Sequence, residues 1–162
     1  MNMYLAVMKS ILVLGAGRSS SSLIRRLLER AVDCDWKVVV GDIDLDVAKL
    51  KVGEHERGES FKLSDCDNEE RDRRIAESDL VLSMVPAFLH VSVAKVAISN
   101  RVPVITPSYL SEEMKALDSV AKEAGVLVLN ELGLDPGIDH MSAMKVIDEI
   151  KAEGGKLIGF ES

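Results

Sequence analysis

The chain has 162 residues, of which 47% are hydrophobic, and its formal net charge is −7 at pH 7. This length and apolar content suit one globular domain with a packed core. The acidic balance disfavours nucleic acid and anionic membranes as partners, because both would repel it. No apolar run approaches the roughly 20 residues that span a bilayer. Residues Met1–Met8 lack the features of a signal peptide, so a cytoplasmic location is expected by default.

The cysteines and histidines show no pattern typical of a disulfide or a metal site. Cys34 and Cys66 lie far apart in the sequence, and no Cys-x-x-Cys pair occurs. His55, His90 and His140 do not have the spacing of metal ligands. We therefore expect neither a disulfide nor a bound metal.

Short apolar runs alternate with longer amphipathic segments along the chain. Runs such as 11–14 and 38–40 are continuously apolar, as strands covered on both faces must be. This alternation predicts βαβ units and a doubly wound parallel sheet, that is, a three-layer α/β/α Rossmann domain over residues 1–162. The expected strands are Ser10–Leu14, Lys37–Val40, Glu59–Leu63, Leu80–Val85, Val102–Thr106 and Val126–Asn130. The expected helices are Ser20–Ala31, Asp44–Lys51, Asp67–Ala76, His90–Ser99, Ser111–Ala124 and Gly137–Lys151.

Residues typical of helix ends support these bounds. Ser111 is the expected N-cap of one helix, and Gly125 is its expected left-handed C-terminal cap. Asp44 is expected to cap the helix that follows it. Asp135 and Pro136 are expected as the N-cap and the first residue of the last helix, where the missing N–H of proline costs nothing.

The last segment, Lys156–Glu161, has the composition of a strand, and the sequence stops directly after it. No terminal cap or polar tail follows, which suggests a fragment of a longer protein. A truncated unit exposes apolar surface, which would favour either a homodimer or aggregation.

The segment Gly15-Ala16-Gly17-Arg18-Ser19-Ser20 follows a predicted strand and opens a predicted helix. A glycine-rich turn in this context is typical of dinucleotide binding. Gly15 permits the tight turn, and Gly17 lets the backbone approach a pyrophosphate without a Cβ in the way. The helix-start amides and the hydroxyls of Ser19 and Ser20 are candidate donors to the phosphate oxygens. Ser20 replaces the third glycine of the usual pattern, so a turn that only joins a strand to a helix is the alternative.

An acidic residue, Asp42, ends the second predicted strand. It stands about 20 residues past the glycine turn, where the ribose-binding acid of such folds is found. Its carboxylate would accept hydrogen bonds from the ribose hydroxyls and repel a 2′-phosphate. We therefore expect NAD to be preferred over NADP; the alternative is a solvated acid at a strand end.

A doubly wound sheet binds its ligand beyond the carboxyl ends of its strands. That geometry predicts a cleft lined by Asp65, Cys66, Val85, Pro86 and residues 106–109. For Pro86 there are two equally favoured interpretations: it lines the cleft, or it only ends the preceding strand.

Two segments resemble the glutamate-forming saccharopine dehydrogenases: Thr106–Ser111, with the sequence TPSYLS, and Asn130–His140, with the sequence NELGLDPGIDH. The similarity extends from Lys9 to Phe160, and Gly133–His140 is its most specific part. The resemblance implies a Rossmann domain joined to an α+β substrate domain. It also implies the interconversion of saccharopine with glutamate and 2-aminoadipate semialdehyde, using a nicotinamide cofactor. We therefore expect an oxidoreductase of lysine metabolism that acts on the C–N bond of an amino-acid adduct.

The resemblance also implies site residues. Ser108 and Tyr109 match the substrate contacts of the family; the alternative for Tyr109 is a half-buried tyrosine bound to water. No residue qualifies as a general base, and we interpret His140 as a helix-start histidine satisfied by the backbone. The residues that match the family's cofactor contacts are Gly15, Ala16, Gly17, Arg18, Asp42, Ile43, Asp65, Cys66, Val85, Pro107, Leu134, Asp135 and Pro136.

The chain departs from the family in two respects. Fungal members carry arginine and threonine in place of Asp42 and Ile43, which agrees with the expected preference for NAD. A Cys-Gly-Gly-Leu-Pro motif and the substrate domain, which follow in the family, are absent, so we expect cofactor binding without turnover. Two alternatives are a stand-alone NAD-sensing regulatory domain and a related dehydrogenase acting on a different amine.

Overall fold

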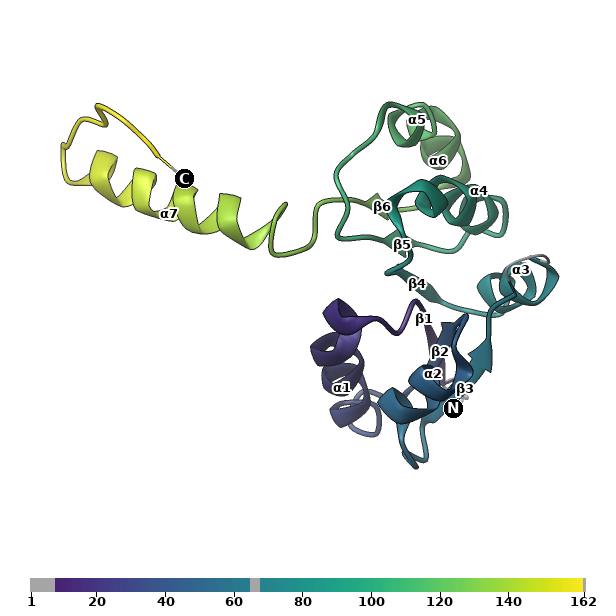
Figure 1. Cartoon of the computed structure of the whole chain (residues 1–162). Helices are drawn as coiled ribbons and strands as arrows, with labels where there is room; N and C mark the ends of the chain where they lie inside the picture. Colours follow the sequence, from purple (N-terminus) through teal and green to yellow (C-terminus); the bar gives the residue numbers. More distant parts are fainter. Residues whose placement is uncertain (1–7, 65–67, 162) are drawn as a thin grey trace, which may run out of the picture.

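The computed structural model describes residues 8–64 and 68–161. Six strands form one sheet in the order β3-β2-β1-β4-β5-β6, and every neighbouring pair is parallel (Figure 1). The predicted doubly wound Rossmann fold is confirmed, and the order of the strands reverses between β1 and β4. The strands are β1 (Lys9–Leu14), β2 (Trp36–Asp42), β3 (Gly58–Lys62), β4 (Leu80–Ser83), β5 (Val104–Ile105) and β6 (Val128–Leu129).

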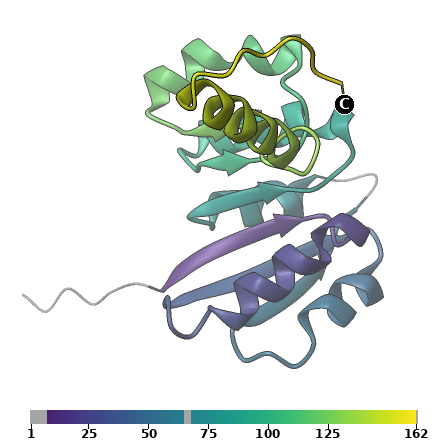
Figure 2. The same ribbon diagram turned by 90° about the vertical axis from the view of Figure 1, so that its left-hand side faces the viewer.

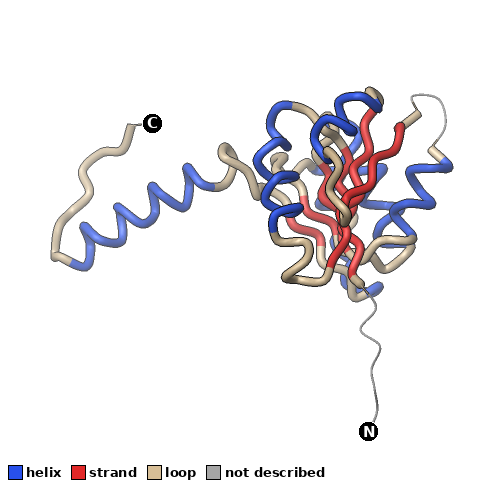
Figure 3. Tube along the Cα trace, turned by 90° about the horizontal axis from the view of Figure 1, so that it is seen from below, coloured by secondary structure: helices blue, strands red, loops and turns tan. Residues whose placement is uncertain are grey.

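Helices cover both faces of this sheet, as the view from below shows (Figure 3). The α-helices are α1 (Ser21–Glu29), α2 (Leu45–Val52), α3 (Glu69–Ala76), α4 (His90–Ser99), α5 (Glu112–Lys115), α6 (Asp118–Ala124) and α7 (Ile138–Ala152). Two short 3-10 helices, η1 (Arg18–Ser20) and η2 (Ala87–Leu89), precede α1 and α4. No helix in the described part of the chain combines the length and apolar character needed to cross a membrane.

The apolar strands contribute side chains to two separate cores, because successive side chains of a strand point to opposite faces of the sheet. In β1, Leu12 and Leu14 join the core beneath α3 and α4, whereas Ile11 and Val13 join the core beneath α1 and α2. All four side chains are buried. Figure 2 shows α1 and α2 together on their face of the sheet. The continuous apolar run therefore has the double coverage that the sequence predicts.

Three helix ends are formed as predicted. The Asp44 carboxylate accepts hydrogen bonds from the amides of Asp46 and Val47 at the start of α2. The Ser111 hydroxyl accepts one from the amide of Met114. Gly125 ends α6 in the left-handed conformation, with φ 68°.

The predicted helix Ser111–Ala124 is wrong as one element, because the chain forms α5 and α6 instead. The Leu117 amide bonds to the carbonyl of Met114, three residues back, which tightens the turn between the two helices. Met114 then packs in the core beneath α4, while Ala121 packs in a small separate cluster. The two short helices therefore pack their side chains into different clusters, whereas one continuous helix was predicted.

The predicted strand Lys156–Glu161 is also wrong, since this segment is irregular and belongs to no described strand of the sheet. The chain leaves the sheet at α7, which projects from the body of the molecule (Figure 1) and buries none of its residues. After Gly154 the chain turns back, and Leu157 and Phe160 line a cavity with side chains of α7. The segment is therefore too far from the sheet to pair with it.

Candidate functional site

The turn between β1 and η1 contains two glycines with different roles. Gly15 has φ +103°, and a Cβ built on it would lie 2.6 Å from the carbonyl oxygen of Met84. Only glycine allows that conformation and that close approach. Gly17 has an ordinary φ of −63°, and a Cβ there would meet nothing within 4 Å. Gly17 therefore leaves open space at the start of the helix.

Ser20, which replaces the third glycine, faces inward. Its side chain is fully buried and its hydroxyl donates a hydrogen bond of 2.9 Å to the carbonyl oxygen of Gly17. The expectation that this hydroxyl donates to a phosphate is therefore not met by this geometry, because the turn itself uses the proton. A small buried side chain at this position keeps the helix close to the strands. Ser19 and Arg18 are exposed beside it.

The Asp42 carboxylate ties the end of β2 to the glycine turn. One oxygen, Oδ2, accepts a hydrogen bond of 2.6 Å from the amide of Ala16, and Oδ1 accepts one of 2.9 Å from the amide of Asp44. Both oxygens thus have partners within the protein. The Asp42 carboxylate therefore helps to form the turn. Its position at a strand end does not by itself indicate that it binds a ribose.

A cavity of about 600 Å³ lies beside this turn, and we call it the glycine-turn cavity. It brings together six predicted residues, which are Gly15, Gly17, Asp42, Ile43, Val85 and Pro86. Asp65 and Cys66 lie outside the described residues. Residues that the sequence analysis did not single out also line the cavity: Leu63, Ser64, Asn68, Arg71, Met84, Phe88, Leu89 and Val93.

Arg71 is the cationic member of that second group. Its side chain is 13% exposed and pairs with the Asp72 carboxylate at 2.7 Å. In the sequence it lies in a stretch of mixed charges, typical of a solvated helix face. Only its position in the first turn of α3, the helix that follows β3, could have suggested a place in the cleft.

A second cavity, of about 460 Å³, lies at the carboxyl ends of β4, β5 and β6, and we call it the Tyr109 cavity. The predicted residues that line it are Pro107, Ser108, Tyr109, Asp135 and Pro136, together with His90, Ser111 and Asn130 among others. Leu134 is 74% exposed and lines neither of these two cavities. The predicted cofactor contacts are therefore divided between two places.

The Tyr109 hydroxyl donates a hydrogen bond of 2.5 Å to the Asp135 carboxylate. This bond to the carboxylate holds the pKa of the Tyr109 hydroxyl above its usual value. The predicted role of Asp135 as a helix N-cap is wrong, because α7 begins only at Ile138 and its N-cap is Gly137. Asp139 instead accepts a hydrogen bond from the amide of Gly137.

His90 lies at the start of α4, and its side chain contacts three hydroxyl groups. Ser83 Oγ is 2.8 Å from Nδ1, Ser108 Oγ is 2.7 Å from Nε2, and Thr106 Oγ1 is 3.2 Å from Nε2. Burial lowers the pKa of the imidazole. The sequence analysis did not assign His90 a role; the available signal was a pair of hydroxyl residues, Ser83 and Thr106, at the ends of apolar strands.

His140 is exposed, and its Nδ1 lies 2.8 Å from the Asp139 carboxylate. This hydrogen bond raises the pKa of the imidazole. The interpretation of a histidine satisfied by the backbone is therefore wrong, because the partner is a neighbouring side chain. His140 lines neither the glycine-turn cavity nor the Tyr109 cavity.

The chain after β4 separates the two cavities. Pro86, Phe88 and Leu89 line the glycine-turn cavity, whereas Ala87, His90 and Val91 line the Tyr109 cavity. Pro86 thus lines the cleft, and β4 has already ended at Ser83. One short segment therefore contributes residues to both cavities.

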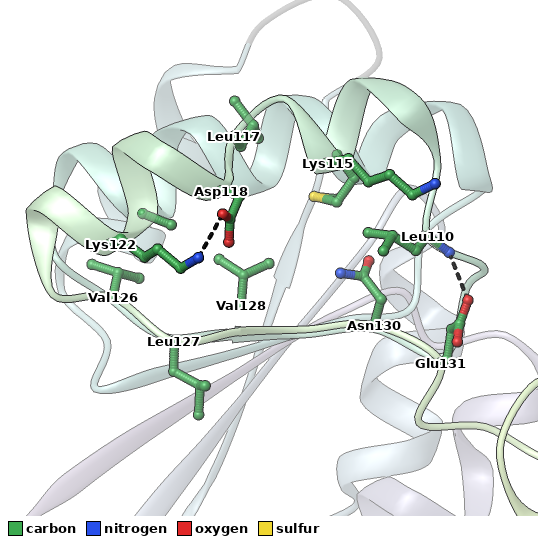
Figure 4. A pocket seen from close by; sticks show the side chains of 12 residues that line it. Leu110, Lys115, Leu117, Asp118, Lys122, Val126, Leu127, Val128, Asn130 and Glu131 are labelled. Carbon is green, nitrogen blue, oxygen red and sulfur yellow. Dashed lines mark hydrogen bonds and ion pairs between the residues drawn. The ribbon is translucent and has the colours of Figure 1, made fainter.

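A third cavity, of about 600 Å³, lies between α5, α6 and β6 (Figure 4). Its wall is largely aliphatic, and Figure 4 shows Lys122 paired with Asp118, at 2.7 Å. No residue of the glycine turn lines it. We therefore place the candidate site at the other two cavities.

The sheet order and the glycine turn define a Rossmann-type domain, a class whose members bind dinucleotides beyond the carboxyl ends of the strands. Residues 11–129 match the family model described as "Saccharopine dehydrogenase NADP binding domain". The chain belongs to the saccharopine dehydrogenase family.

Three known proteins illustrate the relationship. The chain is 40% identical over 154 residues to saccharopine dehydrogenase [NADP(+), L-glutamate-forming] of Pyricularia oryzae, covering 95% of this chain and 33% of that protein. It is 36% identical to the mitochondrial alpha-aminoadipic semialdehyde synthase of Bos taurus, covering 95% of this chain and 16% of that one. The structure of apo saccharopine dehydrogenase (L-Glu forming) from Saccharomyces cerevisiae superimposes with a TM-score of 0.79 at 36% identity, covering 92% of this chain and 33% of that one. The chain therefore spans a third or less of the length of these relatives.

The predicted preference for NAD over NADP is wrong. The family model is an NADP-binding domain, and the fungal relative is named as an NADP(+) enzyme. The prediction depended on a free Asp42 carboxylate that repels a 2′-phosphate. In the structure that carboxylate accepts hydrogen bonds from two backbone amides, so the premise does not hold.

Proposed function

We propose that this chain is the NADP-binding part of a saccharopine dehydrogenase-like oxidoreductase in lysine metabolism. The observation that carries the proposal is the open space at Gly17, next to a helix start and a 600 Å³ cavity, in a chain of this family. The reaction we propose is the oxidation of saccharopine at its C–N bond to an imine, with hydride transfer to the nicotinamide cofactor. Water then hydrolyses the imine to glutamate and 2-aminoadipate semialdehyde.

The residues at the turn fit a dinucleotide. Gly15 lets the turn pass close to the Met84 carbonyl oxygen, and the missing Cβ of Gly17 leaves room for a pyrophosphate. The space lies at a helix start, the kind of position where backbone amides bind phosphate in other proteins. Val85 and Pro86 line the same cavity where it reaches the end of β4.

The chain's own residues would bind and orient the reactants. A bound nicotinamide supplies the hydride acceptor. Ser108 and Tyr109 present hydroxyls to the Tyr109 cavity, where the Asp135 carboxylate fixes the direction of the phenol. Because this chain is a third of the length of the fungal relative, we propose that it binds the cofactor without turning over saccharopine.

Calorimetric titration with NADP and NAD tests the cofactor site. We expect saturable binding of NADP and a loss of about tenfold or more in Gly17→Ala, that is, about 1.4 kcal/mol. The added methyl meets no protein atom within 4 Å, so folding should be unchanged. Gly159→Ala is the matched control, since a Cβ there also meets nothing within 4 Å.

Each outcome decides the proposal. Equal NADP affinity in Gly17→Ala and in the unaltered chain would show that the space at the turn is not the binding site. Tighter binding of NAD than of NADP would contradict the cofactor assignment. Formation of reduced cofactor on mixing the chain with NADP and saccharopine would contradict the proposed lack of turnover.

A further inference from the structure

The imidazole of His90 links helix α4 to the ends of strands β4 and β5 through contacts with hydroxyl groups. It is 3% exposed and begins α4, while Ser83 ends β4 and Ser108 follows β5. Among the described residues, no charged side chain hydrogen-bonds to the ring, whose partners are the hydroxyls of Ser83, Thr106 and Ser108. The nearby titratable groups that line the same cavity are Tyr109 and Asp135, which bond to each other.

A neutral imidazole has one nitrogen that donates and one that accepts. Ser83 Oγ lies at Nδ1 and Ser108 Oγ lies at Nε2, so each nitrogen has its own hydroxyl. If Nδ1 donates to Ser83, then Ser108 must donate to Nε2 and turns its lone pairs to the cavity. In the other tautomer, Ser108 accepts from Nε2 and its proton is free for a ligand. Either tautomer assigns the Ser108 hydroxyl one hydrogen-bonding role.

Ser108 is half-buried and lines the Tyr109 cavity, so this role is presented to whatever the cavity holds. Thr106 Oγ1 lies between the two ring nitrogens, at 3.2 and 3.3 Å, and accepts a hydrogen bond from the amide of Ser108. The hydroxyl and the backbone of Ser108 are therefore both tied to the same buried group. Such a fixed donor or acceptor suits a small polar ligand, such as an amino-acid-derived substrate.

We propose that His90 is a positioning residue, which sets the direction of the Ser108 hydroxyl in the Tyr109 cavity through a Ser83–His90–Ser108 chain of hydrogen bonds. The inference rests on the proposed function, in which Ser108 contacts the substrate. His90 also lines this cavity, but the role proposed for it is exercised through Ser108.

Nitrogen-15 NMR of the His90 ring, in the unaltered chain without ligand, tests the arrangement directly. We expect one neutral tautomer at pH 8, and we expect the buried ring to stay neutral at pH values below the ordinary pKa of 6.5. Ser83→Ala should shift mainly the Nδ1 resonance, and Ser108→Ala mainly the Nε2 resonance. Two tautomers in fast exchange, or ordinary titration near neutral pH, would overturn the proposal.

Two amide variants test the positioning. Glutamine places its amide near Nε2, so His90→Gln can keep the partner Ser108, whereas His90→Asn keeps Ser83. We measure binding of L-saccharopine, with NADP present, from the shift of the Ser108 amide resonance. The expected result is retained affinity in His90→Gln and an affinity about threefold to tenfold weaker in His90→Asn.

The two failures are distinguishable. Equal losses in both amide variants would show that His90 has only a structural role and would overturn the proposal. If saccharopine leaves the Ser108 resonance of the unaltered chain unmoved, the proposed substrate contact fails. The ring spectra, which need no ligand, still decide the arrangement of His90 in that case.

Discussion

The two cavities are built by different means. The glycine-turn cavity takes its shape from backbone: the absent side chains of Gly15 and Gly17, and amides held by the Asp42 carboxylate. The Tyr109 cavity depends on side-chain hydrogen bonds between groups far apart in sequence, such as His90 with Ser108 and Tyr109 with Asp135. A site formed by backbone should be disrupted by substitutions that add a side chain to a glycine. A site formed by side chains should be disrupted by substitutions that remove a hydrogen-bond partner.

Gly15→Ala should break the first site most severely. The new Cβ would lie 2.6 Å from the Met84 carbonyl oxygen, and φ is +103°. We expect the free energy of unfolding to fall by about 3 kcal/mol, from strain and overpacking together. Gly53→Ala is the control, since φ is +61° and no atom lies within 4 Å, so only about 1 kcal/mol should be lost. Equal losses in urea unfolding would mean that the contact with Met84 is unimportant.

Asp42→Ala removes the partner of two backbone amides at the same turn. Charge-assisted hydrogen bonds of this kind suggest a loss of about 2 kcal/mol in the free energy of unfolding, with weaker NADP binding. Asp44→Asn should be nearly silent, because asparagine caps a helix as well as aspartate does. Unchanged stability in Asp42→Ala would show that the carboxylate does not support the turn.

The second site should respond to pH through His90. Burial lowers its pKa from the ordinary 6.5, so the unfolded chain takes up a proton before the folded chain does. The stability from neutral His90 is therefore complete above pH 6.5 and is lost as pH falls, at no more than about 1.4 kcal/mol per pH unit. His90→Gln should lack this part of the decline in urea unfolding between pH 7.5 and pH 5. An identical decline in both proteins would contradict the prediction.

The contribution of His140 to the pH dependence must be separated from that of His90, because the hydrogen bond to Asp139 raises the pKa of the His140 imidazole. The stability from this pair is present below pH 6.5, the ordinary value, and is lost as pH rises through the folded-state pKa. Its effect runs opposite to that of His90. His140→Asn in both backgrounds isolates the contribution of the buried ring.

The smallest expected effect belongs to Tyr109→Phe. The side chain is 62% exposed, so removal of its hydroxyl should change the free energy of unfolding by no more than about 0.5 kcal/mol. Asp135→Asn is the matched change on the other partner of the hydrogen bond. A loss well above that size in thermal unfolding would show that this pair stabilises the fold, and that it is not held ready for a ligand.

The fold was largely predictable because its signals are local. The apolar runs of β1 and β2 and the caps at Asp44 and Ser111 depend on neighbouring residues alone, and the structure has them as predicted. The break between α5 and α6 depends on where Met114 and Ala121 find their cores, which no local pattern encodes.

The site was predictable to a lesser extent, for the same reason. The glycine turn is a contiguous motif, so the open space at Gly17 follows from it. The inward hydroxyl of Ser20 and the amide partners of Asp42 depend on the folded geometry, which misled the inference about the cofactor. His90 lies far in sequence from Ser108, and only the sheet brings them together.

Helix α7 departs from the wall of the Tyr109 cavity, since Pro136 lines that cavity and the helix begins two residues later. Its 15 residues span about 22 Å as a rigid rod. A rotation of about 10° at this joint would move the far end by about 4 Å. The helix would thus amplify small movements of the cavity wall, and a fluorescent label near Ala152 would report them.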